Sequence, residues 1–538
     1  MGLWGNRSDN RIELDAEIRE IPHGKGPRFA PEKGCLPGTR IAFLDFIVNW
    51  VNNPDSERTL VLFGQAGTGK SSIAHEIARR FNKMHRLTSS FIFLRKEQSE
   101  GEAYHLFTSL ARDLSDRYPS FKAALGRVIK GDSSLRLRTR DYPTLFESLI
   151  LEPLKGLHTV GPILVVIDAL DESGDVTGGN GLHKFLAKHL STLPSNFRVL
   201  ITSRPEHDIE SAFVEAPSFR IKYMGDFELA AKTHDDIIAF IRERLPSDEF
   251  RIYGNALAKK AEGLFQWAAV ACGYVLKPPG SFSFSKKKCI EHLLRLSADY
   301  QRQDPLDELY KEVLEGYFIH QEARLLFRSV VGQLITAFEP LSIRSLTTLR
   351  HHASNDDDDY NSVVEMLRHL GSLLSNVNSA NQNLPMVPLH TSFRDFLTSK
   401  DKSGDFCVGL RDAHRQLASS CFGLLLNGLK FNICDLESSY LANKDVKDLD
   451  SRVDNHIPPA LLYACRFWDD HLKHINFEID LFVQLRSFFE KKFLFWLEAL
   501  SLTSNVGVAS PALSALNVWL ASGRGVSIIV DSMRKANN

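Results

Sequence analysis

The sequence predicts an α/β domain, in which a parallel sheet is covered by helices on both faces, followed by a long helical region. Two observations favour this fold class. Short apolar runs alternate with helical patterns between about residues 59 and 224. Beyond about residue 226 the strand patterns fade, and helical spacing continues almost to the end of the sequence. Uninterrupted apolar strands are typical of parallel sheets that are buried on both faces.

The elements of the α/β region follow one another along the chain. A lead-in helix comes first, because apolar residues between 41 and 48 recur at helical spacing. Each later strand is a short apolar run, and each later helix is an amphipathic pattern. The predicted strands are 59–63, 90–94, 163–167, 198–202 and 219–224, and the predicted helices are 39–51, 71–81, 103–118, 142–157 and 182–193.

The region after the sheet is predicted to be helical. Helices are expected at 235–245 and 255–276, and a solvated linker follows at 281–288. Between 305 and 400 we expect helices, an acidic loop at 355–359 and a β-type segment at 386–389. The expected domains are a polar N-terminal tail (1–35), the α/β domain (36–225), a small helical domain with a linker (226–304), a further domain (305–400) and a C-terminal helical domain (401–538).

The composition excludes several classes of protein. The 538 residues are 43% hydrophobic, which argues against a disordered chain and suffices for several domains. The 65 basic and 66 acidic residues give a net charge of −1, so no surplus of charge favours nucleic acid. Seven cysteines without a Cys-x-x-Cys pair predict neither a disulfide framework nor a zinc site. Because the sequence has no signal peptide and no apolar run long enough for a membrane span, we expect a cytoplasmic protein.

The segment between the first strand and the next helix carries the strongest motif. It matches G-x-x-x-x-G-K-[ST], a phosphate-binding loop, in the strand–loop–helix context that this motif requires. Glycines let main-chain N–H groups surround an anion, and the helix N-terminus adds positive potential. Lys70 would reach the β- and γ-phosphates, and the Ser71 hydroxyl would bind Mg²⁺. The candidate nucleotide-binding residues are Gly64, Gln65, Ala66, Gly67, Thr68, Gly69, Lys70, Ser71 and Ser72. The structural alternative is a glycine-rich turn without a ligand.

Acidic residues close the third predicted strand. The run Ile-Leu-Val-Val-Ile-Asp-Ala-Leu-Asp-Glu places carboxylates at the carboxyl edge of the sheet, where the phosphates would lie. Asp168 is suited to hold Mg²⁺ through a water molecule. Asp171 or Glu172 would orient the attacking water. The structural alternative is the solvated start of a helix.

The fourth predicted strand also ends in polar residues. Thr202 or Ser203 would hydrogen-bond a water near the γ-phosphate, and Arg204 would detect the charge of that phosphate. The structural alternative for Arg204 is an ion pair on the surface.

These three segments, in this order, resemble the NACHT class of signal-transducing P-loop ATPases, which is also grouped with the nephrocystin-like N-terminal P-loop module. The resemblance is closest to the fungal NLR-like (STAND) proteins, because segments 35–40, 389–397, 458–468 and 496–502 are similar to stretches of that family. It implies an α/β P-loop NTPase domain, a small helical domain, a winged-helix domain at 305–400 and a helical array. It also implies ATP or ADP with Mg²⁺ as cofactors, in preference to GTP.

The resemblance assigns a role to one further residue, His390, and leaves the role of Phe265 open. In relatives, the histidine at the position of His390 contacts the β-phosphate of ADP and holds a closed state. Here the sequence is Leu-His-Thr where many relatives have Met-His-Asp, so the acidic partner is missing, and a core histidine is the alternative. Phe265 stands where the wider class has a proline that packs on adenine. It would stack on the base or belong to the helix core.

The function that the resemblance implies is a signalling switch with slow ATPase activity, of the innate immunity or incompatibility type. Nucleotide-dependent self-association is implied, with protein partners for sensing and output, because no effector domain or 20–50-residue repeat is evident. Two alternatives remain: a scaffold with a structural nucleotide, and a metabolic P-loop NTPase. A DNA-binding winged helix is disfavoured because its region lacks a basic surplus.

Overall fold

The computed structural model describes most of the chain, in two compact units, Met1–Ala269 and Val270–Asn538. The finer division into five domains stays a prediction. Most of the expected N-terminal tail and parts of the expected linker and acidic loop lie outside the described residues. The described residues are 18, 29–93, 102–131, 141–157, 159, 161–173, 181–216, 218–226, 230–276, 286–295, 304–354, 359–377, 381–438 and 440–522.

A five-stranded sheet forms the centre of the first unit, and every pair of neighbouring strands is parallel. The order across the sheet is β2-β3-β4-β1-β5. All five predicted strands are confirmed, although β2 begins three residues before its expected start. Their bounds are β1 Thr59–Phe63, β2 Leu87–Ile92, β3 Ile163–Asp168, β4 Phe197–Ser203 and β5 Phe219–Tyr223. Strands β3, β4 and β1 are neighbours, so their carboxyl ends meet at one edge.

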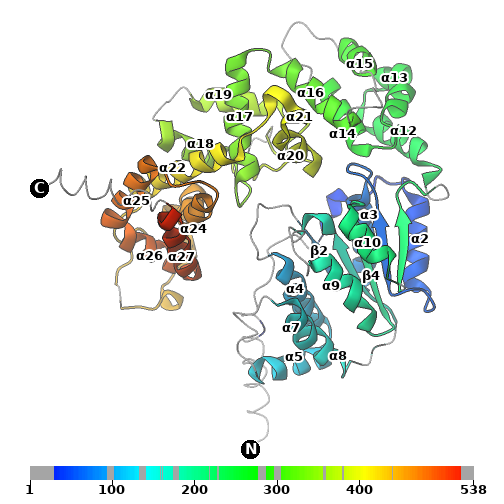
Figure 1. Cartoon of the computed structure of the whole chain (residues 1–538), viewed down its shortest axis with the longest axis horizontal. Helices are drawn as coiled ribbons and strands as arrows, with labels where there is room; N and C mark the ends of the chain where they lie inside the picture. Colours follow the sequence, from blue (N-terminus) through cyan, green and yellow to red (C-terminus); the bar gives the residue numbers. More distant parts are fainter. Residues whose placement is uncertain are drawn as a thin grey trace, which may run out of the picture. The chain divides into compact units, whose positions relative to one another are not determined.

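Alternate side chains of the strands enter two separate cores, which confirms a sheet covered on both faces. Val61 and Phe63 pack in one core with α4, α5, α7, α9 and α10. Leu60 and Leu62 pack in the other core with α2 and α3. Figure 1 shows α2 on one side of the sheet and α4, α7 and α9 on the other. The bounds are α2 Ile41–Asn52, α3 Lys70–Lys83, α4 Glu102–Arg117, α5 Pro119–Gly131, α7 Tyr142–Phe146, α9 Leu182–His189 and α10 His207–Val214.

Two of the predicted helices are interrupted. The helix expected at 142–157 contains a π-helical turn, Glu147–Leu151, between α7 and α8 (Glu152–Leu154). The helix expected at 255–276 is two helices, α13 (Ser247–Lys260) and α14 (Phe265–Leu276). Between them Glu262 and Gly263 have φ values of 48° and 85°. Residues in the left-handed conformation end a right-handed helix, so the prediction of one long helix was wrong.

The second unit is helical, and α14 leads into it. Its first part has two isolated antiparallel bridges, Ser342 with Pro385 and Leu374 with Pro388. The second of these bridges lies within the β-type segment expected at 386–389, although no strand is assigned among described residues 381–438. The winged-helix assignment stays a prediction. The helices are α15 Lys286–Arg295, α16 Pro305–Tyr317, α17 Gln321–Thr336, α18 Ile343–Ser354, α19 Asp359–His369, α20 Thr391–Thr398, α21 Lys400–Ser403, α22 Leu410–Gly428, α23 Leu449–His456, α24 Pro459–Lys473, α25 Ile479–Lys491, α26 Phe493–Leu502 and α27 Ala509–Ser522.

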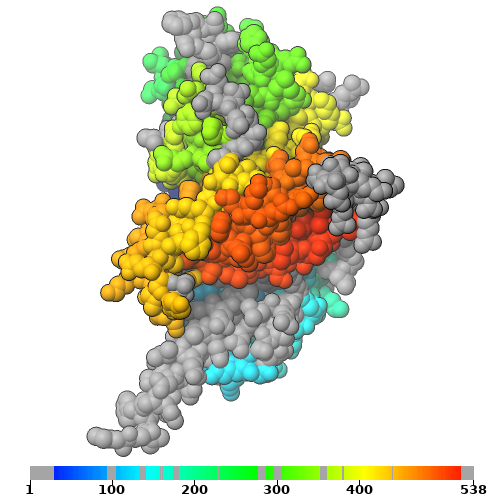
Figure 2. All heavy atoms as spheres, turned by 90° about the vertical axis from the view of Figure 1, so that its left-hand side faces the viewer, coloured from blue at the N-terminus to red at the C-terminus, as the bar shows by residue number. Residues whose placement is uncertain are grey.

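The last helices pack around α22 and α24, and Figure 2 shows them as one continuous body, coloured from orange to red. A buried chain of polar groups joins them to Phe338, two residues after the end of α17. The Phe338 N–H donates to the Tyr463 hydroxyl at 3.2 Å. That hydroxyl lies 2.8 Å from His471 Nε2, and His471 Nδ1 lies 2.8 Å from His414 Nδ1. Within the described ranges, no helix is long and apolar enough to cross a bilayer.

Candidate functional site

The strand order brings the three sequence motifs together. The glycine-rich loop follows β1, the acidic segment follows β3, and Thr202 to Arg204 close β4. Because β4 lies between β3 and β1, all three segments share one edge of the sheet. Ligands of open α/β sheets bind at this carboxyl edge.

The loop has the backbone that the motif requires. Gly69 is the N-cap of α3 with φ 93°, a conformation that disfavours a side chain. Gly64 is confined for a different reason, since a Cβ there would lie 2.5 Å from Met224 Cγ. The loop therefore leads directly into the N-terminus of α3, whose unpaired N–H groups and helix dipole favour an anion.

Lys70 is buried at the first turn of α3 and folds back onto the loop. Its ammonium donates to the main-chain oxygens of Gly64 at 2.7 Å and of Gln65 at 3.0 Å. Burial lowers the pKa of Lys70 to about 8, against the opposing effect of Asp171 and Asp168. A phosphate at the loop would stabilise the charged ammonium.

Asp168 ends β3 and receives hydrogen bonds from two other segments. The Ser71 hydroxyl donates to Asp168 Oδ1 at 3.2 Å. The Thr202 hydroxyl donates to the same oxygen and accepts from the Ala169 N–H at 3.1 Å. Thr202 thus fixes both the carboxylate and the turn that follows it. From the sequence, Thr202 or Ser203 was expected to bind a water near the γ-phosphate, and this support of Asp168 by Thr202 was not predicted.

The donor set fits magnesium. Mg²⁺ prefers oxygen ligands and usually keeps several of its water molecules in proteins. Ser71 Oγ and Asp168 Oδ1 are 3.2 Å apart, so a candidate direct ligand lies next to a candidate acceptor for a metal-bound water. The two side chains are therefore near enough to hold one hydrated ion.

Asp171, on the turn after β3, and Arg204, directly after β4, form an ion pair. Arg204 Nε lies 3.1 Å from Asp171 Oδ2, and the Arg204 N–H donates to Oδ1 at 3.0 Å. The side chains are only 20% and 5% exposed, so this pair is not a surface pair. Glu172 is also buried, on the single turn Leu170–Glu172. The carboxylates expected to orient water therefore lie on the predicted segment, one of them paired with the predicted arginine.

A second contact to the loop comes from residues outside the three motifs. Arg40 Nη2 donates to the Thr68 oxygen at 2.7 Å, and the Gln266 N–H donates to the Gly67 oxygen at 3.2 Å. The Phe265 ring lies 4.7 Å from the Arg40 guanidinium and packs edge to face on Phe240. One face of Phe265 is therefore covered by an arginine, and the side chain is half-buried; its stacking on a base stays a prediction.

His390 lies in the second unit. It is half-buried and caps α20, with Nδ1 accepting from the Ser392 N–H at 3.1 Å. This local capping bond explains the histidine without a nucleotide. Its contact with a β-phosphate stays a prediction.

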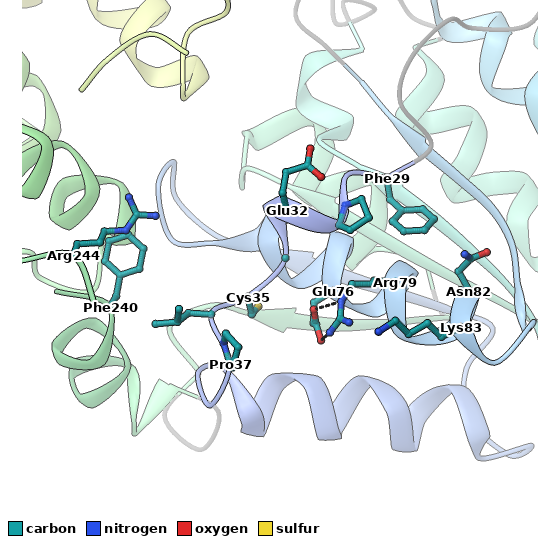
Figure 3. Close-up of a pocket in the computed structure, with 13 residues that line it drawn as sticks. Phe29, Glu32, Cys35, Pro37, Glu76, Arg79, Asn82, Lys83, Phe240 and Arg244 are labelled. Atoms are coloured by element: carbon teal, nitrogen blue, oxygen red, sulfur yellow. Dashed lines mark hydrogen bonds and ion pairs between the residues drawn. The ribbon is translucent and has the colours of Figure 1, made fainter. Parts of the chain in front are cut away.

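A cavity of about 660 Å³ lies beside α3. Its walls are α3 itself, the segment before α2, and α12 (Thr233–Arg244). Figure 3 shows Phe240 and Arg244 on one side and Asn82 and Lys83 on the opposite side. Burial raises the pKa of the Cys35 thiol in its wall to about 12, so that thiol is protonated at neutral pH. The phosphate loop does not line this cavity.

Residues 41–204 match the family model described as nephrocystin 3, N-terminal. The match runs from α2 to Arg204 and includes the loop and the acidic segment. No curated protein matches the chain. Among solved structures, similarity is found to a signal transduction ATPase with numerous domains (STAND) protein with a tetratricopeptide repeat sensor from Pyrococcus horikoshii, at 13% identity and a TM-score of 0.37. That alignment covers 95% of this chain and 66% of the other, so this chain spans just under two thirds of that protein.

Proposed function

We propose that the chain is a nucleotide-dependent switch that binds ATP or ADP with Mg²⁺ and hydrolyses ATP slowly. The observation that carries the proposal is the meeting of Ser71, at the phosphate loop, with Asp168, at the end of β3. A hydroxyl and a carboxylate at this spacing beside a glycine-rich loop suit a metal-bound polyphosphate. The family match over the same residues supports a P-loop module.

The residues of the loop bind and orient the nucleotide. The N–H groups from Gly64 to Ser72 would surround the phosphates, and Lys70 would turn from its main-chain acceptors toward the β- and γ-phosphates. Ser71 would bind the metal directly, with Asp168 holding it through water and Thr202 fixing Asp168. Mg²⁺ supplies charge that neutralises the phosphate oxygens.

Hydrolysis would use the acidic segment. Glu172 or Asp171 would orient the attacking water, and Arg204 would contact the γ-phosphate. Asp171 is bound by Arg204 on both oxygens, so it would reach a water only when this ion pair opens. When Arg204 turns to a γ-phosphate, its bond to Asp171 would break. The ATP and ADP states would therefore differ in this ion pair.

The switch would act through the rest of the chain. His390 would hold an ADP-bound closed form, and ATP would favour an open, self-associating form, with protein partners for sensing and output. A winged-helix domain at 305–400, a fungal NLR-like role in innate immunity or incompatibility and a cytoplasmic location belong to this proposal on the sequence resemblance alone. A scaffold with a structural nucleotide and a metabolic NTPase are the alternatives.

Native mass spectrometry of the purified chain with ADP or a non-hydrolysable ATP analogue tests the proposal. We expect one nucleotide per chain and a larger assembly with the ATP analogue. Absence of bound nucleotide would refute the site. The same assembly with both nucleotides would support the scaffold, and phosphate release that requires an added acceptor would support the metabolic enzyme.

A further inference from the structure

Arg40 is a buried arginine at the start of α2, outside the motifs that carry the proposed function. It is the N-cap of this helix, with φ 58°, and its residue surface is 4% exposed. A buried guanidinium remains charged and is costly unless hydrogen bonds satisfy it. Its partners therefore show which segments the fold joins at this point.

The partners belong to two other segments of the first unit, the phosphate loop and α12. Nη2 donates to the Thr68 oxygen of the phosphate loop, and Nη1 donates to the Thr233 hydroxyl, both at 2.7 Å. The main-chain N–H donates to Asp236 Oδ2 at 3.0 Å. Thr233 and Asp236 both lie on the first turn of α12. Arg40 thus connects the loop to the helical segment that follows the sheet.

The contact with the loop fixes the direction of a peptide group. In a planar trans peptide, the carbonyl of Thr68 and the N–H of Gly69 point in opposite directions. Because Arg40 binds this carbonyl, it determines where the Gly69 N–H points. The arginine also lies against the loop, since a Cβ on Gly69 would be 4.0 Å from Arg40 Nε. A charged donor at the oxygen further polarises the N–H of the same peptide.

We propose that Arg40 is a positioning residue that holds the Gly69 N–H toward the phosphates and transmits nucleotide binding to α12. This inference rests on the proposed nucleotide site. Any shift of the Thr68–Gly69 peptide on phosphate binding changes the geometry at Nη2, and the rigid guanidinium carries that change to Thr233 through Nη1. Loss of Arg40 then has two effects: faster release of nucleotide and loss of the response in α12.

Three variants separate these effects. Arg40→Ala removes both side-chain bonds, and Arg40→Lys keeps the charge but can reach one acceptor. Thr233→Val removes only the side-chain bond to α12 and leaves the main-chain bond to Asp236 in place. Arg58→Ala is the matched control, because Arg58 also donates to a main-chain oxygen, that of Ser191, but precedes β1 at the opposite end of the strand. The measurements are the dissociation rate of fluorescent ADP, the hydrogen exchange of α12 with and without ADP, and the unfolding midpoint.

We expect Arg40→Ala to release ADP about tenfold faster, the effect of one charge-assisted hydrogen bond. Arg40→Lys should restore part of this rate. Thr233→Val should release ADP at the wild-type rate, while its α12 exchange no longer responds to ADP. Arg58→Ala should match the wild type in both measurements, whatever it does to the unfolding midpoint.

Two failures are distinguishable. If the wild-type chain does not bind ADP, the proposed function fails and this inference fails with it. If the wild type binds ADP and Arg40→Ala releases it at the same rate, with the α12 response intact, only the inference is overturned. Should Arg40→Ala not fold, unchanged release in Arg40→Lys together with an unchanged α12 response in Thr233→Val would overturn it equally.

Discussion

Both carboxylate oxygens of Asp171 are bound by one residue, Arg204, through its side chain at 3.1 Å and its main-chain N–H at 3.0 Å. The main-chain bond keeps Asp171 in place even when the guanidinium moves. The arginine can therefore exchange its side-chain partner without disturbing the acidic segment. If the proposed function holds, Arg204 would detect the charge of a γ-phosphate by this exchange of partners.

Arg204→Ala should reduce the affinity for a non-hydrolysable ATP analogue about tenfold and leave ADP affinity within about twofold, because only ATP carries a γ-phosphate. Equilibrium titration with both nucleotides measures this difference. Arg220→Ala on β5 is the control, since Arg220 is 37% exposed and lies 3.9 Å from Glu57. An equal loss for both nucleotides would contradict the sensor role.

Lys70→Ala should weaken ADP binding about a hundredfold, since it removes a charged donor to phosphate. In the wild type, the pKa of Lys70 near 8 means that ADP must bind together with a proton at higher pH. Affinity should be constant below pH 8 and fall as the pH rises above it, by up to about tenfold per unit. Calorimetry in two buffers measures the proton uptake. Unchanged affinity in Lys70→Ala would remove the site assignment.

Asp168→Asn and Thr202→Val should both raise the Mg²⁺ concentration that nucleotide binding requires, the first by about tenfold or more. Thr202→Val tests whether the orientation of Asp168 matters for metal binding. It removes the hydroxyl that orients Asp168 but leaves every candidate metal ligand in place. Titration with Mg²⁺ at fixed nucleotide gives both values. Asp208→Asn, with a 59% exposed side chain, is the control.

Glu172→Gln should leave ADP affinity intact and slow phosphate release about a hundredfold, because the amide cannot act as a base. A single-turnover assay with bound ATP measures the step directly. Normal turnover in this variant would assign the role to Asp171. The exposed Glu215→Gln should behave as the wild type.

The polar chain in the second unit predicts acid sensitivity. The Tyr463 hydroxyl accepts from the Phe338 N–H and shares a hydrogen bond with His471 Nε2, while His471 Nδ1 shares one with His414 Nδ1. Burial lowers the pKa of His471 well below its ordinary value. An unfolded chain then binds the proton first, so stability is complete above about pH 6.5 and falls as the pH drops below it.

Tyr463→Phe should cost about 1–3 kcal/mol, because it leaves the Phe338 N–H and His471 unsatisfied in the interior. Urea unfolding at pH 7.5 and pH 5.5 measures both effects. His207→Gln, at a 93% exposed side chain, should change neither. Equal stability of the wild type at the two pH values would contradict the role of His471.

The strands could be predicted because each is an apolar run that is buried on both faces, as β1 illustrates. The break in the helix expected at 255–276 could not, because Leu264 and Phe265 continue the apolar pattern and the left-handed residues are Glu262 and Gly263. Only the glycine is a usual helix terminator, and it also occurs inside helices.

Within the site, the phosphate loop and Asp168 could be predicted, because each belongs to a short run of consecutive residues. The support of Asp168 by Thr202 could not be predicted, because it depends on β3 and β4 being neighbours in the sheet. Arg40 was missed for the same reason. Its partners Thr68, Thr233 and Asp236 are distant in sequence, and no periodicity encodes a contact of that kind.

The strand order has a consequence for biosynthesis. β1, which precedes the phosphate loop, pairs on one side with β4 and on the other with β5, and both are translated much later. Until β4 has left the ribosome, β1 has neither neighbour, and the strand that precedes the loop is unpaired on both sides. A nascent chain that stops before Phe197 would therefore be unable to bind a nucleotide. The site would become functional only after β4 has paired with β1.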